Sequence, residues 1–204
     1  AAFELWRDYP SAAKKTSTRL REWCDHNKAV LVLDALSLRE LPLILGGANA
    51  RNISVKTTEV AFSEAPSETN VFAQAIGAVS RSALKDNGKS RNFKLFNANC
   101  YTDSVSIPFA DVRIEPEPNI VLWHSFLDDL IHNGKSADEI HTVARREFSG
   151  DDFWKLVNKL RQGRELVITG DHGYGNSAHF STEVREAEAA DILKDEFKAQ
   201  RYMK

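Results

Sequence analysis

The segment at residues 165–175, ELVITGDHGYG, places a carboxylate next to an imidazole at the end of a predicted strand. Residues 166–169 are apolar or β-branched and predict a short buried strand that stops at Gly170, directly before Asp171 and His172. In a parallel α/β sheet, ligands bind at the carboxyl ends of the strands. An aspartate and a histidine there can together bind a divalent metal ion. The same residues would also suit a polar turn, in which Asp and Gly favour the bend and the histidine has no role.

A second predicted strand ends in the same way, at Asp34. Residues 29–33, AVLVL, form the continuous apolar run that is typical of a strand buried on both faces. Ser37 and Glu40 have the spacing of a capping box, which predicts that a helix opens there with Leu38 directed inward. Asp34 could itself cap this helix, but Ser37 already fills that position. Asp34 is therefore a candidate ligand.

A third predicted strand, at residues 120–123, precedes the sequence HSFLDDLIHNG. In a helix, His124, Asp128 and His132 would stand at positions i, i+4 and i+8 and share one face. The spacing of Asp128 and His132 would let a carboxylate and an imidazole bind one metal ion. The alternative is a solvated helix face, which Asp129 fits better than Asp128 does.

A candidate nucleophile lies in the loop at residues 63–69, SEAPSET. The loop follows residues 52–62, whose alternating pattern predicts a strand, and precedes a predicted helix at residues 70–84. Thr69 or Ser67 would then lie at a helix N-terminus, where free N–H groups and the helix dipole stabilise an anion. Either residue could instead serve only as the N-cap of that helix.

These carboxylate, imidazole and hydroxyl groups would converge on one crevice if their strands lie parallel in one sheet. Two divalent metal ions and a hydroxyl nucleophile are the components of metal-assisted phosphoryl transfer. The metal ions neutralise phosphate oxygens and lower the pKa of a bound hydroxyl. The sequence therefore predicts a metal-dependent hydrolase of phosphate esters.

The framework that positions these groups is predicted to be an α/β fold, with a doubly wound, mostly parallel central sheet and helices on both faces. Further helices are predicted at residues 11–27, 136–148, 151–162 and 181–200. Residues 92–119 are interpreted as an insertion over the sheet edge, with short strands at 93–96 and 105–107. Residues 1–204 contain no repeat or linker, which predicts one domain, and the start without Met predicts a piece of a longer protein.

Composition excludes few partners. The 204 residues are 42% hydrophobic and carry 27 basic against 29 acidic side chains, a net charge of −2. No overall field attracts DNA, so a nucleic-acid partner would need a local patch. Cys24 and Cys100 have no metal-type spacing and fit a reduced, cytoplasmic protein. No apolar run approaches about 18 residues, which predicts that no segment spans a membrane.

The order of the motifs resembles that of a known superfamily. VLVLDALS, APSET, the D-x-x-x-H motif at residues 128–132 and ITGDHG follow the order found in the alkaline phosphatase superfamily. The chain is most similar to the PglZ domain of bacterial phage-exclusion systems, from the first strand to beyond the DHG segment. The resemblance implies an alkaline phosphatase-like core and a phosphodiesterase that acts on nucleic acid or nucleotides. It also implies other defence-system proteins as partners.

The resemblance assigns two metal sites, with Zn²⁺ expected and Mn²⁺ or Mg²⁺ as alternatives. The first would be held by Asp34, Asp171 and His172 together with the nucleophile. The PSET sequence places that nucleophile best at Thr69, with Ser67 as the alternative. The Thr69 loop lacks the C/S-x-P-x-R motif of sulfatases, which argues against that activity.

The second metal site would be held by Asp128, His132 and a later histidine. That histidine would be His179 or a residue beyond Lys204. Because this ligand is unsettled, a non-catalytic interaction module of a multi-subunit defence complex is an alternative. A flavodoxin-like nucleotide binder ranks last, because DALSLRE is not a glycine-rich phosphate loop.

Overall fold

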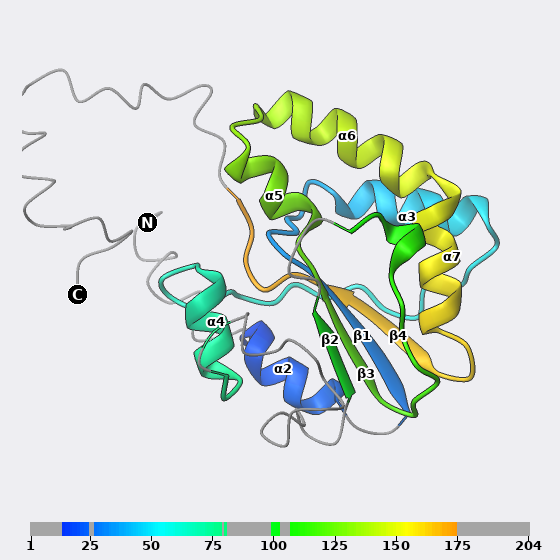
Figure 1. Ribbon diagram of the computed structural model, residues 1–204, viewed down its shortest axis with the longest axis horizontal. Helices are drawn as coiled ribbons and strands as arrows, with labels where there is room; N and C mark the ends of the chain where they lie inside the picture. Colours follow the sequence, from blue (N-terminus) through cyan, green and yellow to red (C-terminus); the bar gives the residue numbers. More distant parts are fainter. Residues whose placement is uncertain (1–13, 25–26, 79, 81–98, 103–106, 175–204) are drawn as a thin grey trace, which may run out of the picture. The chain divides into compact units, whose positions relative to one another are not determined.

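The computed structural model describes residues 14–24, 27–78, 80, 99–102 and 107–174. They form an α/β fold around a four-stranded sheet with the strand order β2-β3-β1-β4, in which every neighbouring pair is parallel (Figure 1). The strands are β1 (Lys28–Leu33), β2 (Asn99–Thr102), β3 (Ile120–His124) and β4 (Glu165–Thr169). The prediction of a parallel α/β sheet is confirmed.

The two central strands are buried on both faces, as their apolar sequences require. In β1 the alternate residues Ala29, Leu31 and Leu33 belong to one hydrophobic cluster, whereas Val30 and Val32 belong to another. Because side chains of a strand alternate between faces, the two clusters are the two sides of the sheet. β4 is an edge strand among the described residues and is only partly buried.

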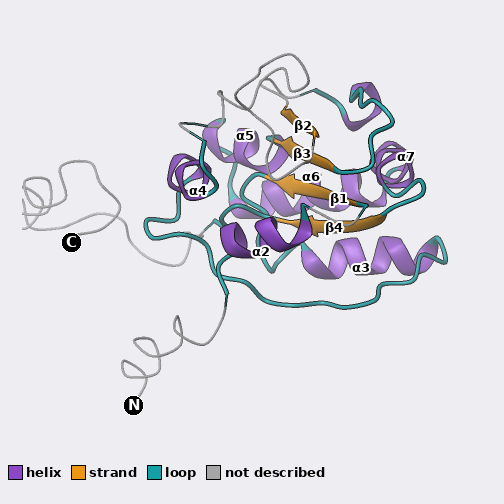
Figure 2. Ribbon diagram, turned by 90° about the horizontal axis from the view of Figure 1, so that it is seen from below, coloured by secondary structure: helices purple, strands orange, loops and turns teal. Residues whose placement is uncertain are grey.

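Helices cover both faces, as predicted. On the face of Leu31, the core includes residues of α3, α5, α6, α7 and the short 3-10 turn η3, and on the other face it includes residues of α2 and α4 (Figures 1 and 2). Their bounds are α2 Thr16–Trp23, α3 Leu41–Ala50, α4 Thr69–Ala75, η3 Phe109–Asp111, α5 Phe126–His132, α6 Ala137–Ser149 and α7 Asp151–Leu160. Over the described residues, no helix combines the length and the apolar character that a membrane crossing requires.

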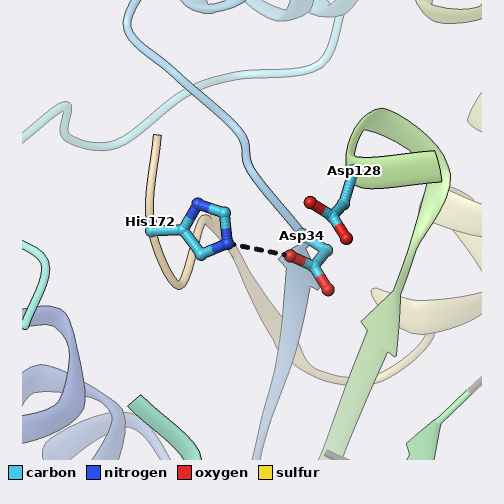
Figure 3. A group of neighbouring side chains, drawn as sticks. All are labelled: Asp34, Asp128 and His172. Carbon is cyan, nitrogen blue, oxygen red and sulfur yellow. Dashed lines mark ion pairs between the residues drawn. The ribbon is translucent and has the colours of Figure 1, made fainter. Parts of the chain in front are cut away.

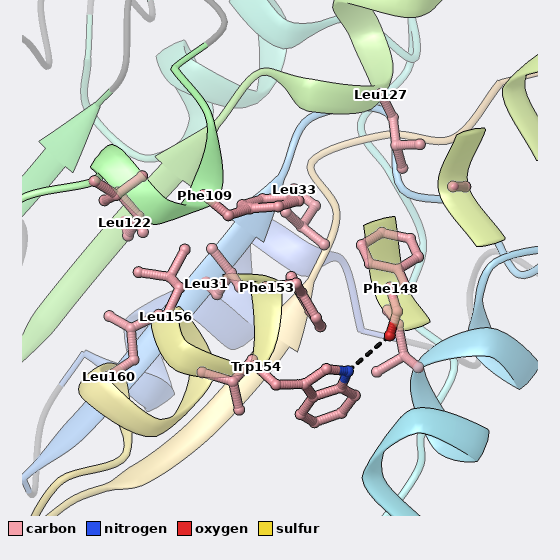
Figure 4. Packing of buried hydrophobic residues seen from close by; sticks show 14 of the residues in the cluster. Leu31, Leu33, Phe109, Leu122, Leu127, Phe148, Phe153, Trp154, Leu156 and Leu160 are labelled. Carbon is pink, nitrogen blue, oxygen red and sulfur yellow. Dashed lines mark hydrogen bonds between the residues drawn. The ribbon is translucent and has the colours of Figure 1, made fainter. Parts of the chain in front are cut away.

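Aromatic rings fill the core beneath α6 and α7 (Figure 4). Phe153 lies edge-on to Phe109, Phe148 and Trp154, with ring centroids 4.8 to 5.2 Å apart. The buried indole N–H of Trp154 donates a hydrogen bond of 2.7 Å to the carbonyl oxygen of Phe148. Aromatic packing of this kind, with its polar atom satisfied, holds α7 in one position.

Gly47 lets α3 approach this core. A Cβ atom at Gly47 would lie 2.5 Å from Cζ2 of Trp154, whereas one at the exposed Gly46 would meet nothing within 4 Å. We expect Gly47→Ala to lower the free energy of unfolding by about 1–3 kcal/mol through overpacking. Gly46→Ala should raise it by about 0.5–1 kcal/mol, because alanine favours the helix. Urea unfolding of the two variants measures the difference, and equal midpoints would contradict this packing.

The helix after β1 begins later than predicted. It starts at Leu41, not at Ser37, and the Leu38 side chain is 63% exposed rather than directed inward. The cause is Pro42, which lies in the first turn of α3. In a helix opened by Ser37, the same proline would be an interior residue and would break a backbone hydrogen bond. Ser37 and Glu40 instead close a turn before the helix.

The prediction of a strand at residues 52–62 is wrong. Residues 54–60 are all exposed, and among the described residues the segment makes no ladder, only an isolated bridge between Phe62 and Lys15. Ion pairs from Lys56 to Glu165 and from Glu59 to Arg19 tie the segment to the domain. The alternating pattern therefore has no buried face to serve.

Residues 92–119 supply an edge strand, β2, that was not predicted. The expected strand at 93–96 and most of that at 105–107 lie outside the described residues. The helix predicted at residues 136–148 is α6, and a capping box of Ser136 and Glu139 opens it. Only residues 16–23 of the helix predicted at 11–27 are described as helical, and the helix predicted at 181–200 lies outside the described part.

Candidate metal centre

The carboxyl ends of β1, β3 and β4 lie level with one another. Leu33, the last residue of β1, pairs with His124, the last residue of β3. Val32 pairs with Thr169, the last residue of β4. The loops that follow these strands therefore begin side by side, which confirms the predicted convergence of three strand ends.

Three side chains from these loops point toward one another: Asp34 after β1, Asp128 on α5 and His172 after β4 (Figure 3). Each offers one ligand atom, and these atoms all lie within 4.8 Å of one another. Asp34 is fully buried and His172 is 8% exposed. Carboxylate oxygens and an imidazole nitrogen are the ligands that Zn²⁺ and similar divalent ions take in proteins. The group could therefore hold a metal ion.

The hydroxyl of Thr69 lies against the same group. Its Oγ1 donates a hydrogen bond of 3.2 Å to Oδ1 of Asp34 and lies 3.0 Å from Nε2 of His172. The third side of this triangle, between Nε2 of His172 and Oδ1 of Asp34, is 3.3 Å. Ligands at about 2.0–2.1 Å from a tetrahedral ion lie about 3.3–3.4 Å apart. The spacing of these three atoms is thus close to what one metal ion requires.

Asp171 places a second buried carboxylate beside His172. Its Oδ1 accepts a 3.1 Å hydrogen bond from the N–H of Ala35. Its Oδ2 is buried, lies 3.7 Å from Nε2 of His172, and has no hydrogen-bond partner within the part of the chain that the structure describes. Burial raises the pKa of the Asp171 carboxyl to about 7, and the charge of Asp34 acts in the same direction. A cation placed among these carboxylates would remove both penalties.

The ring of His172 is oriented for metal binding. Its Nδ1 lies 2.9 Å from the carbonyl oxygen of Gly173, which can only accept a hydrogen bond. Nδ1 therefore carries a proton, and the lone pair of a neutral ring is on Nε2, toward Asp34. Burial alone would lower the pKa of the imidazole, but the hydrogen bond with Asp34 and the charge of Asp171 outweigh it and raise the pKa to about 9. A metal ion at Nε2 would have to displace this proton.

The backbone directly after Asp34 adopts an unusual conformation next to the site. Ala35 has a φ of 64°, in the left-handed region that a residue with a Cβ seldom adopts. This conformation directs the Ala35 N–H at Asp171, while the N–H of Asp34 donates a 2.8 Å hydrogen bond to the carbonyl oxygen of His124. Strained backbone of this kind is concentrated at functional sites. The sequence DALS does not indicate this left-handed conformation, so the role of Ala35 is not predicted from the sequence.

Of the two histidines expected on α5, His132 lies on the helix and His124 does not. His132 is the last residue of α5, and its Nε2 is 3.2 Å from Oδ2 of Asp128 while its side chain is 73% exposed. His124 does not share that helix face, because it ends β3; it is buried, and its ring bonds the carbonyl oxygen of Ile107 and the N–H of Phe126. His179 lies outside the described residues.

Neither a protein-family model, nor a curated protein, nor a solved structure matches this chain.

Proposed function

We propose that this chain is a metal-dependent phosphoester hydrolase with Thr69 as its nucleophile. The observation that carries the proposal is the position of the Thr69 hydroxyl, 3.2 Å from Oδ1 of Asp34 and 3.0 Å from Nε2 of His172. A threonine that served only a solvated turn would not need its hydroxyl within hydrogen-bond distance of two buried candidate metal ligands. A hydroxyl that binds the same cation as these ligands must lie that close to them.

Each residue of the site would have a separate role in the proposed reaction. When bound, a divalent ion would act as a Lewis acid on the phosphate and lower the pKa of the hydroxyl. Asp34 accepts the hydrogen bond of the Thr69 hydroxyl and so directs a lone pair of Oγ1 away from itself. His172 presents Nε2 to the same oxygen, with its ring held by the Gly173 carbonyl. Asp171 adds a second buried carboxylate to balance the charge of the ion.

The substrate class rests on the resemblance to the PglZ domain and the alkaline phosphatase superfamily. We propose a phosphodiester, in nucleic acid or a nucleotide, as the substrate, within a bacterial anti-phage system that contains other proteins. The alkaline phosphatase-like core and a second metal site at Asp128, His132 and His179 belong to the same proposal. The contact of 3.2 Å between Asp128 and His132 supports the proposal that both bind the same metal ion.

A second candidate function is a non-catalytic interaction module of the same kind of complex. One observation favours it: the side chain of His132 is 73% exposed, although its Nε2 lies 3.2 Å from Oδ2 of Asp128. Asp34 and His172, in contrast, are buried. If the second metal ion has no closed site, the fold could persist without efficient catalysis.

Metal content and hydrolysis together test the proposal. The purified chain, incubated with Zn²⁺ or Mn²⁺ and dialysed, should retain metal by elemental analysis. It should then hydrolyse bis-p-nitrophenyl phosphate faster than p-nitrophenyl phosphate and lose that activity in EDTA. Bound metal without hydrolysis of either ester would favour the interaction module. A chain that retains no metal would contradict both the metal centre and the hydrolase.

A further inference from the structure

The loop that carries Asp171 and His172 is packed closely on the loop that follows Asp34. A Cβ atom at Gly170 would lie 2.7 Å from the carbonyl oxygen of Leu36, so the two backbones nearly touch. Only a glycine allows this approach. The pairing of β4 with β1 fixes the start of the loop that carries His172. The other end of this loop needs a separate contact.

A buried carboxylate, Glu40, supplies that contact. Its side chain is fully buried, and Oε1 accepts a 2.7 Å hydrogen bond from the hydroxyl of Tyr174. Oε2 accepts hydrogen bonds from the N–H and hydroxyl of Ser37, at 3.1 and 2.8 Å. Burial raises the pKa of the Tyr174 hydroxyl, and the Glu40 carboxylate adds to the effect, so the tyrosine remains a donor. A buried carboxylate is tolerable only with such donors around it.

The contact between Glu40 and Tyr174 lies close in sequence to the candidate ligand His172. Tyr174 is two residues beyond His172, and Gly173 between them supplies the carbonyl that orients the imidazole. With β4 at one end and Glu40 at the other, the loop has both ends anchored. We propose that Glu40 and Tyr174 form a clasp, as positioning residues that hold the Asp171–His172 loop in its metal-binding geometry. The clasp rests on the metal centre of the proposed function.

The clasp acts by preorganisation. Gly170 and Gly173 flank the two ligands, and glycines have the largest conformational freedom to lose. Without the Tyr174 hydroxyl bond, metal binding itself would have to order the loop. A loop that is no longer ordered would also lose the Gly173 carbonyl as the outer partner of His172, and loss of such a partner typically weakens metal affinity by about 10- to 100-fold. The sequence gives no sign of this role, because the spacing of Ser37 and Glu40 matches that of a capping box.

Titration of the full chain with Zn²⁺ and Mn²⁺ by calorimetry tests the clasp. Tyr174→Phe keeps the ring and removes the hydroxyl, and we expect Kd to rise by about 10- to 100-fold. Glu40→Gln can keep both contacts, with its carbonyl oxygen accepting from Ser37 and its NH2 group donating to the Tyr174 oxygen, so it should stay within about threefold of the unmodified chain. The visible absorption of the Co²⁺-loaded chain reports ligand geometry, and it should change in Tyr174→Phe but not in Glu40→Gln. A role in stability alone would leave that spectrum unchanged.

Arg39 provides a matched control. Its guanidinium lies over the Tyr174 ring, 5.3 Å from the centroid, and is exposed. Arg39→Met removes this contact, leaves the hydroxyl bond to Glu40, and should change Kd by no more than about twofold. Equal metal affinity and an unchanged Co²⁺ spectrum in Tyr174→Phe would overturn the clasp and leave the proposed function standing. An unmodified chain that binds no metal would overturn both, whereas metal binding without hydrolysis would overturn the hydrolase alone.

Discussion

Thr69→Ala should abolish phosphodiester hydrolysis, with a fall in kcat of about 10³-fold or more, because the reacting oxygen is removed. Thr69 Oγ1 is the hydroxyl that contacts both Asp34 and His172. Thr69→Ser keeps an oxygen at the same position and should retain activity within about tenfold. Steady-state kinetics with bis-p-nitrophenyl phosphate, at saturating Zn²⁺ or Mn²⁺, measures both variants.

The runner-up nucleophile supplies the comparison. Ser67 lies two residues before Thr69 in the same loop, so Ser67→Ala perturbs the same segment without touching the Thr69 hydroxyl. If Ser67→Ala loses activity and Thr69→Ala keeps it, the nucleophile has been assigned to the wrong residue. Thr69 is only partly buried, and the melting temperature of each variant should stay near that of the unmodified chain. A large fall in melting temperature would move the loss of activity from chemistry to folding.

The part of the site that sequence could predict is the part built on strand ends. The run at residues 29–33 and the run at 166–169 each become a strand of the parallel sheet, and the polar residue after each strand reaches the site. This works because an unbroken apolar run that stops at a polar residue is a local signal of a strand, both for the buried β1 and for β4, which is only partly buried. Asp34, Asp171 and His172 are therefore readable from their position alone.

The features that sequence could not predict depend on contacts between distant residues. Residues 52–62 have the alternation of a strand but pair with no strand in the part of the chain that the structure describes. Leu38 is a local exception, because the nearby Pro42 lies in the first turn of α3 and places the start of the helix after Leu38. The positive φ of Ala35 and the burial of Glu40 both follow from how the β4 loop packs, which no local pattern encodes.

Divalent metal should stabilise the folded chain more at high pH than at low pH. The pKa of Asp171 is raised from 3.8 to about 7 and that of His172 from 6.5 to about 9. Both groups thus bind protons more tightly when folded than when unfolded. Their contribution to stability is fully present below the unfolded pKa values and is lost as pH rises through the folded ones. The metal-free chain should therefore lose stability from about pH 4 toward about pH 9.

A metal ion competes with these protons, so its effect runs the opposite way. At a concentration of about 100 times Kd, binding adds about 2.7 kcal/mol, which for a chain of this length raises Tm by about 5–10 °C. We expect that rise near pH 8 and a much smaller one near pH 5, in thermal melts with Mn²⁺ or Zn²⁺ against EDTA. Asp171→Asn keeps the shape and an acceptor for the Ala35 N–H, but it removes the buried charge. It should flatten the pH dependence of the metal-free Tm and remove most of the metal-induced rise. A rise of equal size at both pH values, or one that survives in Asp171→Asn, would show that the metal binds elsewhere on the chain.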